Sequence, residues 1–427
     1  MNRRSPVWHP FTQHAVLADI ESIERGAGAW LETADGRRIL DAISSWWVVT
    51  HGHTHPRMAA AIRAQAERLD QVIFAGFTHE PAERLASKLV ELAPRGLSHV
   101  FYSDSGSTAV EVALKMALGY WHNRGEPRTV IAALEHGYHG DTTAAMSAGA
   151  RGLFSAPYAP MLFDVARLPF PRAGHEQATL DALDAQCRNE SVAALIVEPL
   201  ILGAGGMLMY PPHVLAAMHE ICSRHGTLFI ADEVMTGWGR TGTLFACELA
   251  GITPDILCTA KGLTGGSLPL AATLAKPEIF AAHYSKDRTR TFFHSSSYTA
   301  NPICCAAALA NVAIWEDEPV RERIVALAAL QESKLARFMV DPRFRNARRI
   351  GTIAALDLAV ADAGYLADVG PRFYNASLAQ GVLLRPLGNT IYVMPPYCIT
   401  STELDLVYNA IDAGATHALA PPVSDRA

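Results

Sequence analysis

The chain has 427 residues, of which half are hydrophobic and 18% are charged. This length and composition are typical of a globular protein with two or three domains and a large apolar core. The 36 basic and 42 acidic residues give a formal charge of −6, which argues against a nucleic-acid-binding protein, because such proteins usually carry a basic excess.

The first predicted element is a small antiparallel hairpin within residues 20–50, around the turn Ala34-Asp35-Gly36. The middle of the chain then alternates short apolar runs with helical patterns, which predicts a mostly parallel sheet covered by helices on both faces. The predicted strands are 99–103, 130–134, 193–197, 228–231 and 256–259, and the predicted helices between them include 108–120 and 212–225.

The last hundred residues mix helices and strands without this regular alternation. The predicted elements are a long helix at 320–338, strands at 353–358 and 390–394, and a terminal helix at 402–413. We therefore predict an α/β fold with a large domain at residues 50–315. A small α+β domain would be formed by both ends of the chain, residues 1–49 and 316–427.

Several features predict a cytoplasmic protein. The seven cysteines are scattered, odd in number and without a Cys-x-x-Cys pair, which is typical of reduced thiols. The first ten residues lack the apolar segment of a secretory signal. The apolar runs fall well short of the roughly 18 residues that a membrane helix needs.

Two charged residues end successive apolar strands. Asp232 follows the run 228–231, and Lys261 follows the run 256–259, 29 residues later in the chain. Functional side chains gather at the carboxyl ends of strands in open α/β sheets, although a surface lysine or a polar strand end would explain either residue alone. Taken together, a lysine and a carboxylate are what pyridoxal phosphate (PLP) enzymes need, to bind the aldehyde and to pair with the pyridinium nitrogen.

The segment 104–108, Asp-Ser-Gly-Ser-Thr, joins a predicted strand to a predicted helix. Backbone N–H groups at a helix N-terminus, together with the Ser107 hydroxyl, form a phosphate cradle. The spacing is not that of a P-loop, and an ordinary N-cap by Ser105 or Ser107 is the alternative interpretation.

The segment 136–142, His-Gly-Tyr-His-Gly-Asp-Thr, follows another predicted strand. Its aromatic residue, Tyr138, is placed to lie against a flat cofactor ring. The histidines here and in the run 51–55 lack a carboxylate or cysteine at zinc-motif spacing. We therefore predict no metal site.

Taken together, these residues resemble the class III, or subgroup II, PLP-dependent aminotransferases of fold type I. The matching motifs follow the order of that family across nearly the whole chain. They are Ser105-Gly106-Ser107, Tyr138-His139-Gly140, Glu198-Pro199, Asp232-Glu233-Val234, Gly239-Arg240-Thr241-Gly242 and Lys261.

The resemblance implies roles for the cofactor-binding residues. Lys261 would bind PLP covalently and later carry the proton between the substrate and the cofactor, and Asp232 would keep the pyridine nitrogen protonated. The remaining contacts would come from Tyr138 and Val234 on the two ring faces, from Gly106 and Ser107 on the phosphate, and from Ser296 and Ser297 of the neighbouring subunit of a homodimer.

The resemblance also implies substrate-binding roles. Arg385 would bind the carboxylate of a long keto acid through the planar bidentate geometry of its guanidinium, and Trp46 would line an apolar tunnel. Phe11 stands where many relatives have Tyr, which leaves the amino donor open. Tyr138, Lys261 and Ser295 complete the predicted substrate contacts.

Further stretches, among them Ser44-Ser45-Trp46-Trp47 and Met394-Pro395-Pro396-Tyr397, resemble the branch of the family that serves biotin biosynthesis. This implies transfer of an amino group from S-adenosyl-L-methionine, through PLP, to 8-amino-7-oxononanoate, giving 7,8-diaminononanoate. Alternatives are lysine as donor to the same acceptor, or an ω-aminotransferase acting on ornithine, GABA or a diamine with pyruvate or 2-oxoglutarate. A non-catalytic PLP-sensing or nucleotide-binding module is the alternative from another class.

Overall fold

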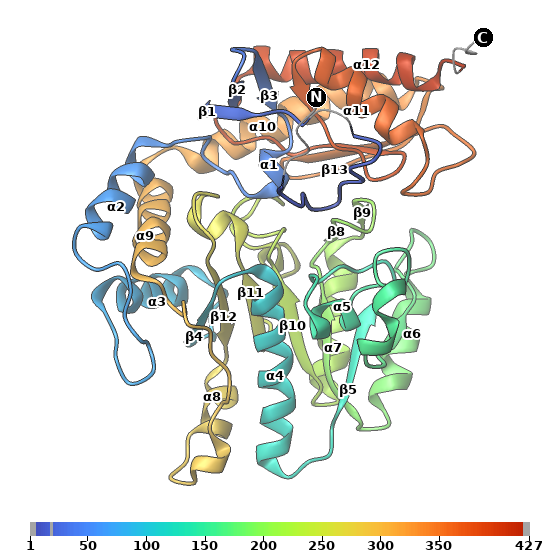
Figure 1. Ribbon diagram of the computed structural model, residues 1–427. Helices are drawn as coiled ribbons and strands as arrows, with labels where there is room; N and C mark the ends of the chain where they lie inside the picture. Colours follow the sequence, from blue (N-terminus) through green and yellow to red (C-terminus); the bar gives the residue numbers. More distant parts are fainter. Residues whose placement is uncertain (1–5, 18–19, 422–427) are drawn as a thin grey trace.

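A seven-stranded sheet organises the middle of the chain (Figure 1). The computed structural model describes residues 6–17 and 20–421. Five neighbouring strands of the sheet are parallel, whereas β12 is antiparallel to both of its neighbours. The strands are, in spatial order, β4 (His99–Ser103), β12 (Ala271–Ala275), β11 (Ile256–Thr259), β10 (Leu228–Asp232), β7 (Val192–Val197), β5 (Val130–Leu134) and β6 (Ala166–Leu168).

Helices cover both faces of this sheet, which explains why its strands are continuous apolar runs. Along β7, Leu195 packs into the core with α6 and α7, whereas the next residue, Ile196, packs into the core with α4 on the opposite face. The predicted α/β fold with a mostly parallel sheet is confirmed, as are the five predicted strands. The covering helices are α4 (Gly106–Arg124), α5 (Thr143–Ala148) and α8 (Pro277–His283) on one face, and α6 (Glu176–Cys187) and α7 (Pro212–Arg224) on the other.

The two ends of the chain meet in one sheet, because β3 from the N-terminal part pairs in parallel with β15 from the C-terminal part. The predicted hairpin around residues 34–36 is confirmed by the antiparallel pairing of β2 with β3. The domain boundaries after residues 49 and 315 stay a prediction. The four strands are β1 (Ile23–Ala27), β2 (Trp30–Thr33), β3 (Arg38–Asp41) and β15 (Val382–Leu383).

A three-stranded sheet and three α-helices complete the C-terminal part, drawn in orange and red in Figure 1. The predicted helix at 320–338 is shorter as an α-helix, because its last turn tightens into a 3₁₀-helix, and the predicted terminal helix at 402–413 extends at both ends. The elements are α10 (Val320–Leu335), η5 (Ala336–Met339), β13 (Phe344–Ile350), β14 (Ile353–Leu358), α11 (Val369–Ala379), β16 (Thr390–Val393) and α12 (Ser401–Leu419).

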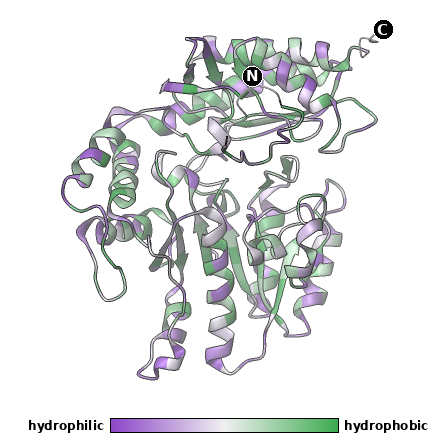
Figure 2. Cartoon of the chain, viewed as in Figure 1, coloured by the Kyte–Doolittle hydropathy of each residue, from purple (hydrophilic) through white to green (hydrophobic). Residues whose placement is uncertain are grey.

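The remaining elements connect these layers. They are α1 (Ser44–Trp47), α2 (Pro56–Ala66), α3 (Glu80–Leu92), η1 (Ala156–Met161), β8 (Ile201–Leu202), β9 (Leu208–Met209), η2 (Ala246–Ala250), η3 (Lys261–Thr264), η4 (Arg288–Arg290) and α9 (Pro302–Asp317). Figure 2 shows hydrophobic residues concentrated along the central strands. Among the described residues, no helix combines the length and apolar character needed to cross a membrane.

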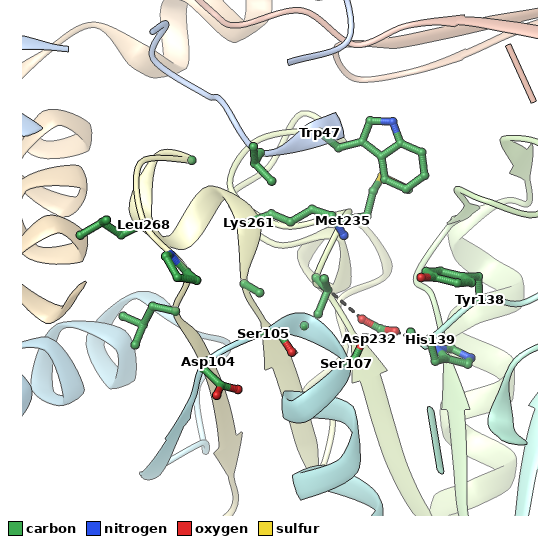
Figure 3. Close-up of a pocket in the computed structure, with 18 of the residues that line it drawn as sticks. Trp47, Asp104, Ser105, Ser107, Tyr138, His139, Asp232, Met235, Lys261 and Leu268 are labelled. Carbon is green, nitrogen blue, oxygen red and sulfur yellow. Dashed lines mark hydrogen bonds and ion pairs between the residues drawn. The ribbon is translucent and has the colours of Figure 1, made fainter. Parts of the chain in front are cut away.

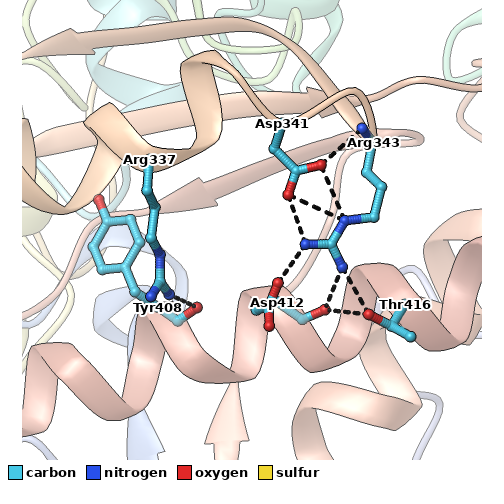
Figure 4. Close-up of polar contacts among 6 residues, drawn as sticks. All are labelled: Arg337, Asp341, Arg343, Tyr408, Asp412 and Thr416. Carbon is cyan, nitrogen blue, oxygen red and sulfur yellow. Dashed lines mark hydrogen bonds and ion pairs between the residues drawn. The ribbon is translucent and has the colours of Figure 1, made fainter.

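Charged side chains fasten α12 to the segment that leads into β13 (Figure 4). The guanidinium of Arg343 donates to the carboxylates of Asp341 and Asp412 and to the Thr416 hydroxyl, 2.7 Å away. These groups are partly exposed, so solvent screens the ion pairs and their contribution to stability is small.

Candidate active site

Lys261 and Asp232 lie at the carboxyl edge of the central sheet and line one cavity of about 410 Å³. Asp232 is the last residue of β10, and its register partner on the parallel strand β11 is Cys258. Lys261 follows three residues later, as the first residue of η3. The structure therefore brings together the two residues that the sequence singled out, as Figure 3 shows.

Asp232 is held by two hydrogen bonds at the base of the cavity. Nδ1 of His139 lies 2.7 Å from Oδ2 of Asp232, and the backbone N–H of Val234 donates to Oδ1 over 3.2 Å. Both side chains are buried. Because a carboxylate only accepts, Nδ1 of His139 must carry the proton of this bond. The pair fixes the direction in which Asp232 presents its negative charge.

The ammonium group of Lys261 lies in surroundings that favour its neutral form. Its Nζ is 5.5 Å from the centroid of the Trp47 ring. Exclusion of water lowers the pKa of Lys261, although the negative charges of Asp232 and Glu198 oppose this effect. A lysine with a lowered pKa has a larger neutral fraction, and the neutral amine is the form that attacks an aldehyde or accepts a proton.

The N-terminus of α4 forms one wall of the cavity. Ser105 caps the helix, because its Oγ accepts from the backbone N–H of Thr108 while Thr108 Oγ1 accepts from the N–H of Ser105. In the part of the chain that the structure describes, no protein group pairs with the N–H groups of Gly106 and Ser107, and both residues line the cavity. The predicted N-cap and the predicted cradle are thus features of the same turn.

Two glycines allow this turn to sit close to its neighbours. A Cβ on Gly106 would lie 2.5 Å from Cγ1 of Val234, and a Cβ on Gly140 would overlap Oγ of Ser107. The Ser107 hydroxyl also accepts from the N–H of Asp141 over 3.2 Å. The turn is therefore packed against the segments that follow β5 and β10, where only glycine leaves room.

These residues fit PLP. Lys261 supplies a primary amine with a lowered pKa, Asp232 supplies a buried carboxylate, and the start of α4 supplies backbone donors for an anion. Tyr138 and Val234 line the same cavity, and their side chains suit the two faces of a flat ring. The volume lies within the range of cofactor sites.

A further carboxylate, Glu198, lines the cavity, and no role was assigned to it from the sequence. Its two oxygens accept from the backbone N–H groups of Tyr138 and Gly203, both over 2.9 Å. Burial raises the pKa of Glu198 to about 7, and the nearby charge of Asp232 adds to this shift. The sequence contains a signal that could have identified Glu198, because the Glu198-Pro199 pair directly follows the carboxyl end of β7, as Asp232 closes β10.

The predicted substrate residues Phe11, Trp46 and Arg385 form a cluster beside the cavity. The guanidinium carbon of Arg385 lies 4.9 Å from the centroid of the Trp46 ring, and an Nη of Arg385 donates to the Phe11 carbonyl over 3.4 Å. The Phe11 ring meets the Trp46 and Phe154 rings edge-on, with centroids 5.7 and 5.6 Å apart. Phe11 and Phe154 also line a second cavity of about 550 Å³.

The serines at 295–297 are not among the residues that line the Lys261 cavity. Ser296 instead donates through its Oγ to Oδ2 of Asp104, 3.2 Å away in the same chain. None of the three serines thus lines the cavity of its own chain, although Ser296 contacts Asp104, which does.

The histidines of the run 51–55 have three different partners. His51 pairs with Asn311, His53 with Asp41, and His55 with Glu318. Burial lowers the pKa of His51 to about 4. Their side chains thus serve separate contacts, and the described residues contain no group of three or more potential ligands arranged to hold a metal ion.

Comparison with known proteins gives consistent matches over nearly the whole chain. The family model described as Aminotransferase class-III matches residues 13–414. The adenosylmethionine-8-amino-7-oxononanoate aminotransferase of Synechococcus elongatus is 48% identical over 95% of this chain and 97% of its own length. The same enzyme of Geobacter sulfurreducens is 38% identical, over 96% and 95%.

Solved structures agree with these matches. The crystal structure of adenosylmethionine-8-amino-7-oxononanoate aminotransferase from Methanocaldococcus jannaschii superposes with a TM-score of 0.91 at 36% identity, over 95% of this chain and 97% of that one. A PLP-bound amine transaminase from an uncultivated Pseudomonas species gives 0.93 at 33% identity, over 98% and 100%. The cofactor is therefore PLP, and the chain belongs to the class-III aminotransferases.

Proposed function

We propose that this aminotransferase moves an amino group from S-adenosyl-L-methionine to 8-amino-7-oxononanoate and so makes 7,8-diaminononanoate for biotin. The observation that carries this proposal is the guanidinium of Arg385 over the Trp46 ring, 4.9 Å from its centroid. An arginine beside an apolar aromatic surface suits an acceptor with a carboxylate at one end of a methylene chain. The two relatives and the Methanocaldococcus jannaschii structure described above are named as enzymes of this reaction, which supports the proposal.

The reaction requires a group that accepts and returns an amino group. Bound PLP supplies an aldehyde that exchanges with amines and a ring that takes up electrons. Lys261 holds a proton at Nζ and moves it to and from the substrate carbon, which its lowered pKa favours. Asp232, held by His139, would supply the negative charge that keeps the ring nitrogen protonated.

Other residues of the chain bind and orient. We assign Gly106 and Ser107 to the phosphate and Tyr138 and Val234 to the two ring faces. Their shared position around the Lys261 cavity supports this assignment. Buried surroundings exclude water, so the charged hydrogen bonds at the base of the site are strong.

On the substrate side, we assign Arg385 to the keto acid carboxylate and Trp46 to its methylene chain. Phe11 is assigned to the amino donor, because its ring joins this cluster to the second cavity. We propose that Tyr138 and Lys261 complete the substrate contacts within the chain, and that Ser295 adds a contact in the neighbouring subunit of the homodimer proposed below.

We further propose a cytoplasmic homodimer in which Ser296 and Ser297 of one subunit complete the phosphate site of the other. The argument for the dimer is the resemblance of the segment 294–298 to the family segment with that role. The argument for the cytoplasm is that all seven cysteines are free, six of them buried.

A half-reaction assay tests the proposed acceptor. The holoenzyme is first loaded with an amino donor, and 8-amino-7-oxononanoate, pyruvate or 2-oxoglutarate is then added alone. We expect only 8-amino-7-oxononanoate to restore the absorbance of the Lys261-bound cofactor, with one equivalent of diamine formed. Restoration by pyruvate or 2-oxoglutarate and not by 8-amino-7-oxononanoate would show a different ω-aminotransferase.

A further inference from the structure

The backbone is left-handed through the whole of α1. Ser44, Ser45, Trp46 and Trp47 have φ values of 53°, 50°, 86° and 75°. L-amino acids with a side chain rarely adopt this conformation, because their Cβ approaches the following carbonyl oxygen. Four successive residues without a glycine persist in it only where surrounding contacts determine the conformation.

Asp41 makes several of those contacts. Its Oδ1 accepts from the backbone N–H groups of Ile43 and Ser45, over 3.2 and 2.9 Å. Its Oδ2 accepts from the Ser45 hydroxyl and faces Nε2 of His53, both at 2.9 Å. The side chain of Asp41 is fully buried. One carboxylate thus receives a hydrogen bond from the backbone of the turn at Ser45, a second from the backbone just before the turn at Ile43, and a third from the Ser45 side chain.

The turn delivers adjacent side chains to two different places. The Trp47 ring lies 5.5 Å from Nζ of Lys261 and lines the cofactor cavity. The Trp46 ring lies under Arg385, 4.9 Å from its guanidinium carbon, in the cluster beside that cavity. A right-handed turn would direct these two side chains differently, because their directions follow from the backbone conformation.

We propose that Asp41 is a positioning residue, which holds Ser44–Trp47 left-handed and thereby sets Trp47 over Lys261 and Trp46 beneath Arg385. Asp41 lines neither cavity; it acts on substrate binding only through the turn. This proposal rests on the proposed function in one respect, because it assumes that Arg385 binds the carboxylate of the acceptor.

The test is a rescue experiment in the holoenzyme. Glycine adopts positive φ without strain, so Ser45→Gly should let the turn keep its conformation when Asp41 is absent. The variants are Asp41→Ala, Asp41→Ala with Ser45→Gly, and Asp41→Ala with Glu190→Gly. Glu190 is an exposed residue far from the turn in the chain, and its φ is also positive, 51°. It is therefore the matched control for a general gain of stability from glycine.

We measure kcat and KM with 8-amino-7-oxononanoate and with an analogue that lacks its carboxylate. Asp41→Ala should lower kcat/KM for the carboxylate substrate on the order of tenfold, mostly through KM, and should affect the analogue less. Ser45→Gly should recover at least half of this loss, and Glu190→Gly should recover none. Equal losses for both acceptors would contradict the effect through Trp46 and Arg385, and equal recovery by both glycines would show that Asp41 only stabilises the fold.

The comparison can still be made if Asp41→Ala fails to fold or if the acceptor is a different one. If Asp41→Ala does not fold, Asp41→Asn with and without Ser45→Gly gives the same comparison, because the amide keeps one acceptor oxygen. If the wild-type enzyme does not convert 8-amino-7-oxononanoate, the proposed function fails. The rescue is then measured with its best carboxylate-bearing acceptor, and an absent rescue there overturns the role of Asp41 separately.

Discussion

His139 Nδ1 lies 2.7 Å from Asp232 Oδ2, with both side chains buried where β10 ends. The histidine fixes the orientation of the carboxylate that we assign to the pyridine nitrogen of PLP. Under this assignment, His139 acts on the chemistry through Asp232.

Two substitutions of His139 should distinguish its role as a hydrogen-bond donor to Asp232 from a role in packing alone. We expect His139→Ala to lower kcat by about tenfold or more, since a hydrogen bond to a charged group contributes about 1.5–3 kcal/mol. His139→Asn, which keeps an N–H donor, should lose less. The measurement is steady-state kcat with saturating donor and acceptor, and equal activity of the two variants would contradict the role of the bond.

Lys261 should be indispensable for turnover. Lys261→Ala removes the amine to which we assign cofactor binding and proton transfer, so kcat should fall by about three orders of magnitude or more. Lys261→Arg retains the positive charge but stays protonated, and should be equally inactive. Cofactor absorbance and product formation are measured together. Turnover by either variant at a wild-type rate would contradict the assignment.

The fold was largely predictable, because β7 and β10 are buried on both faces and therefore appear as continuous apolar runs. Asp232 and Lys261 were recognisable because each directly follows such a run. Strand β12, Ala-Ala-Thr-Leu-Ala, was missed, since alanine has low strand propensity and one of its two antiparallel partners, β4, is distant in the sequence.

The left-handed turn at 44–47 was not predictable in the same way. Its sequence contains no glycine, and one of its contacts, the hydrogen bond from Ser44 to the Met394 carbonyl, joins residues 350 positions apart. The role of Glu198 was hidden for a related reason, because its partners are backbone N–H groups brought together by the tertiary fold.

Glu198 should make the stability of the cofactor-free protein fall as pH rises. Its pKa is about 7 in the folded protein against 4.5 for an ordinary glutamate, so the folded state binds the proton more tightly. The free energy of unfolding therefore decreases between about pH 4.5 and 7 and levels off above that range.

Glu198→Gln removes this titration and is the reference. The wild-type free energy of unfolding, measured by urea titration relative to the variant, should fall by up to about 3 kcal/mol from pH 5 to pH 8. A difference that stays constant or increases over this range would contradict a raised pKa at Glu198.

Arg385 should act on binding of the acceptor. Arg385→Ala should raise KM for 8-amino-7-oxononanoate about tenfold to a hundredfold, because a charged, bidentate hydrogen-bonded pair is lost. The KM of Arg385→Lys should lie between those of the wild type and Arg385→Ala, since lysine keeps the charge without the planar geometry. The analogue without the carboxylate serves as control. An equal change in KM for both acceptors would argue for a structural role of Arg385.

Phe11, whose ring lies 5.7 Å from that of Trp46, is the residue that we assign to the amino donor in the proposed transfer from S-adenosyl-L-methionine to 8-amino-7-oxononanoate. The direct measurement is 7,8-diaminononanoate formed by the holoenzyme with 8-amino-7-oxononanoate and either S-adenosyl-L-methionine or lysine, quantified by mass spectrometry. We predict product with S-adenosyl-L-methionine and none with lysine. Product from lysine alone, or no product with either donor, would contradict the account.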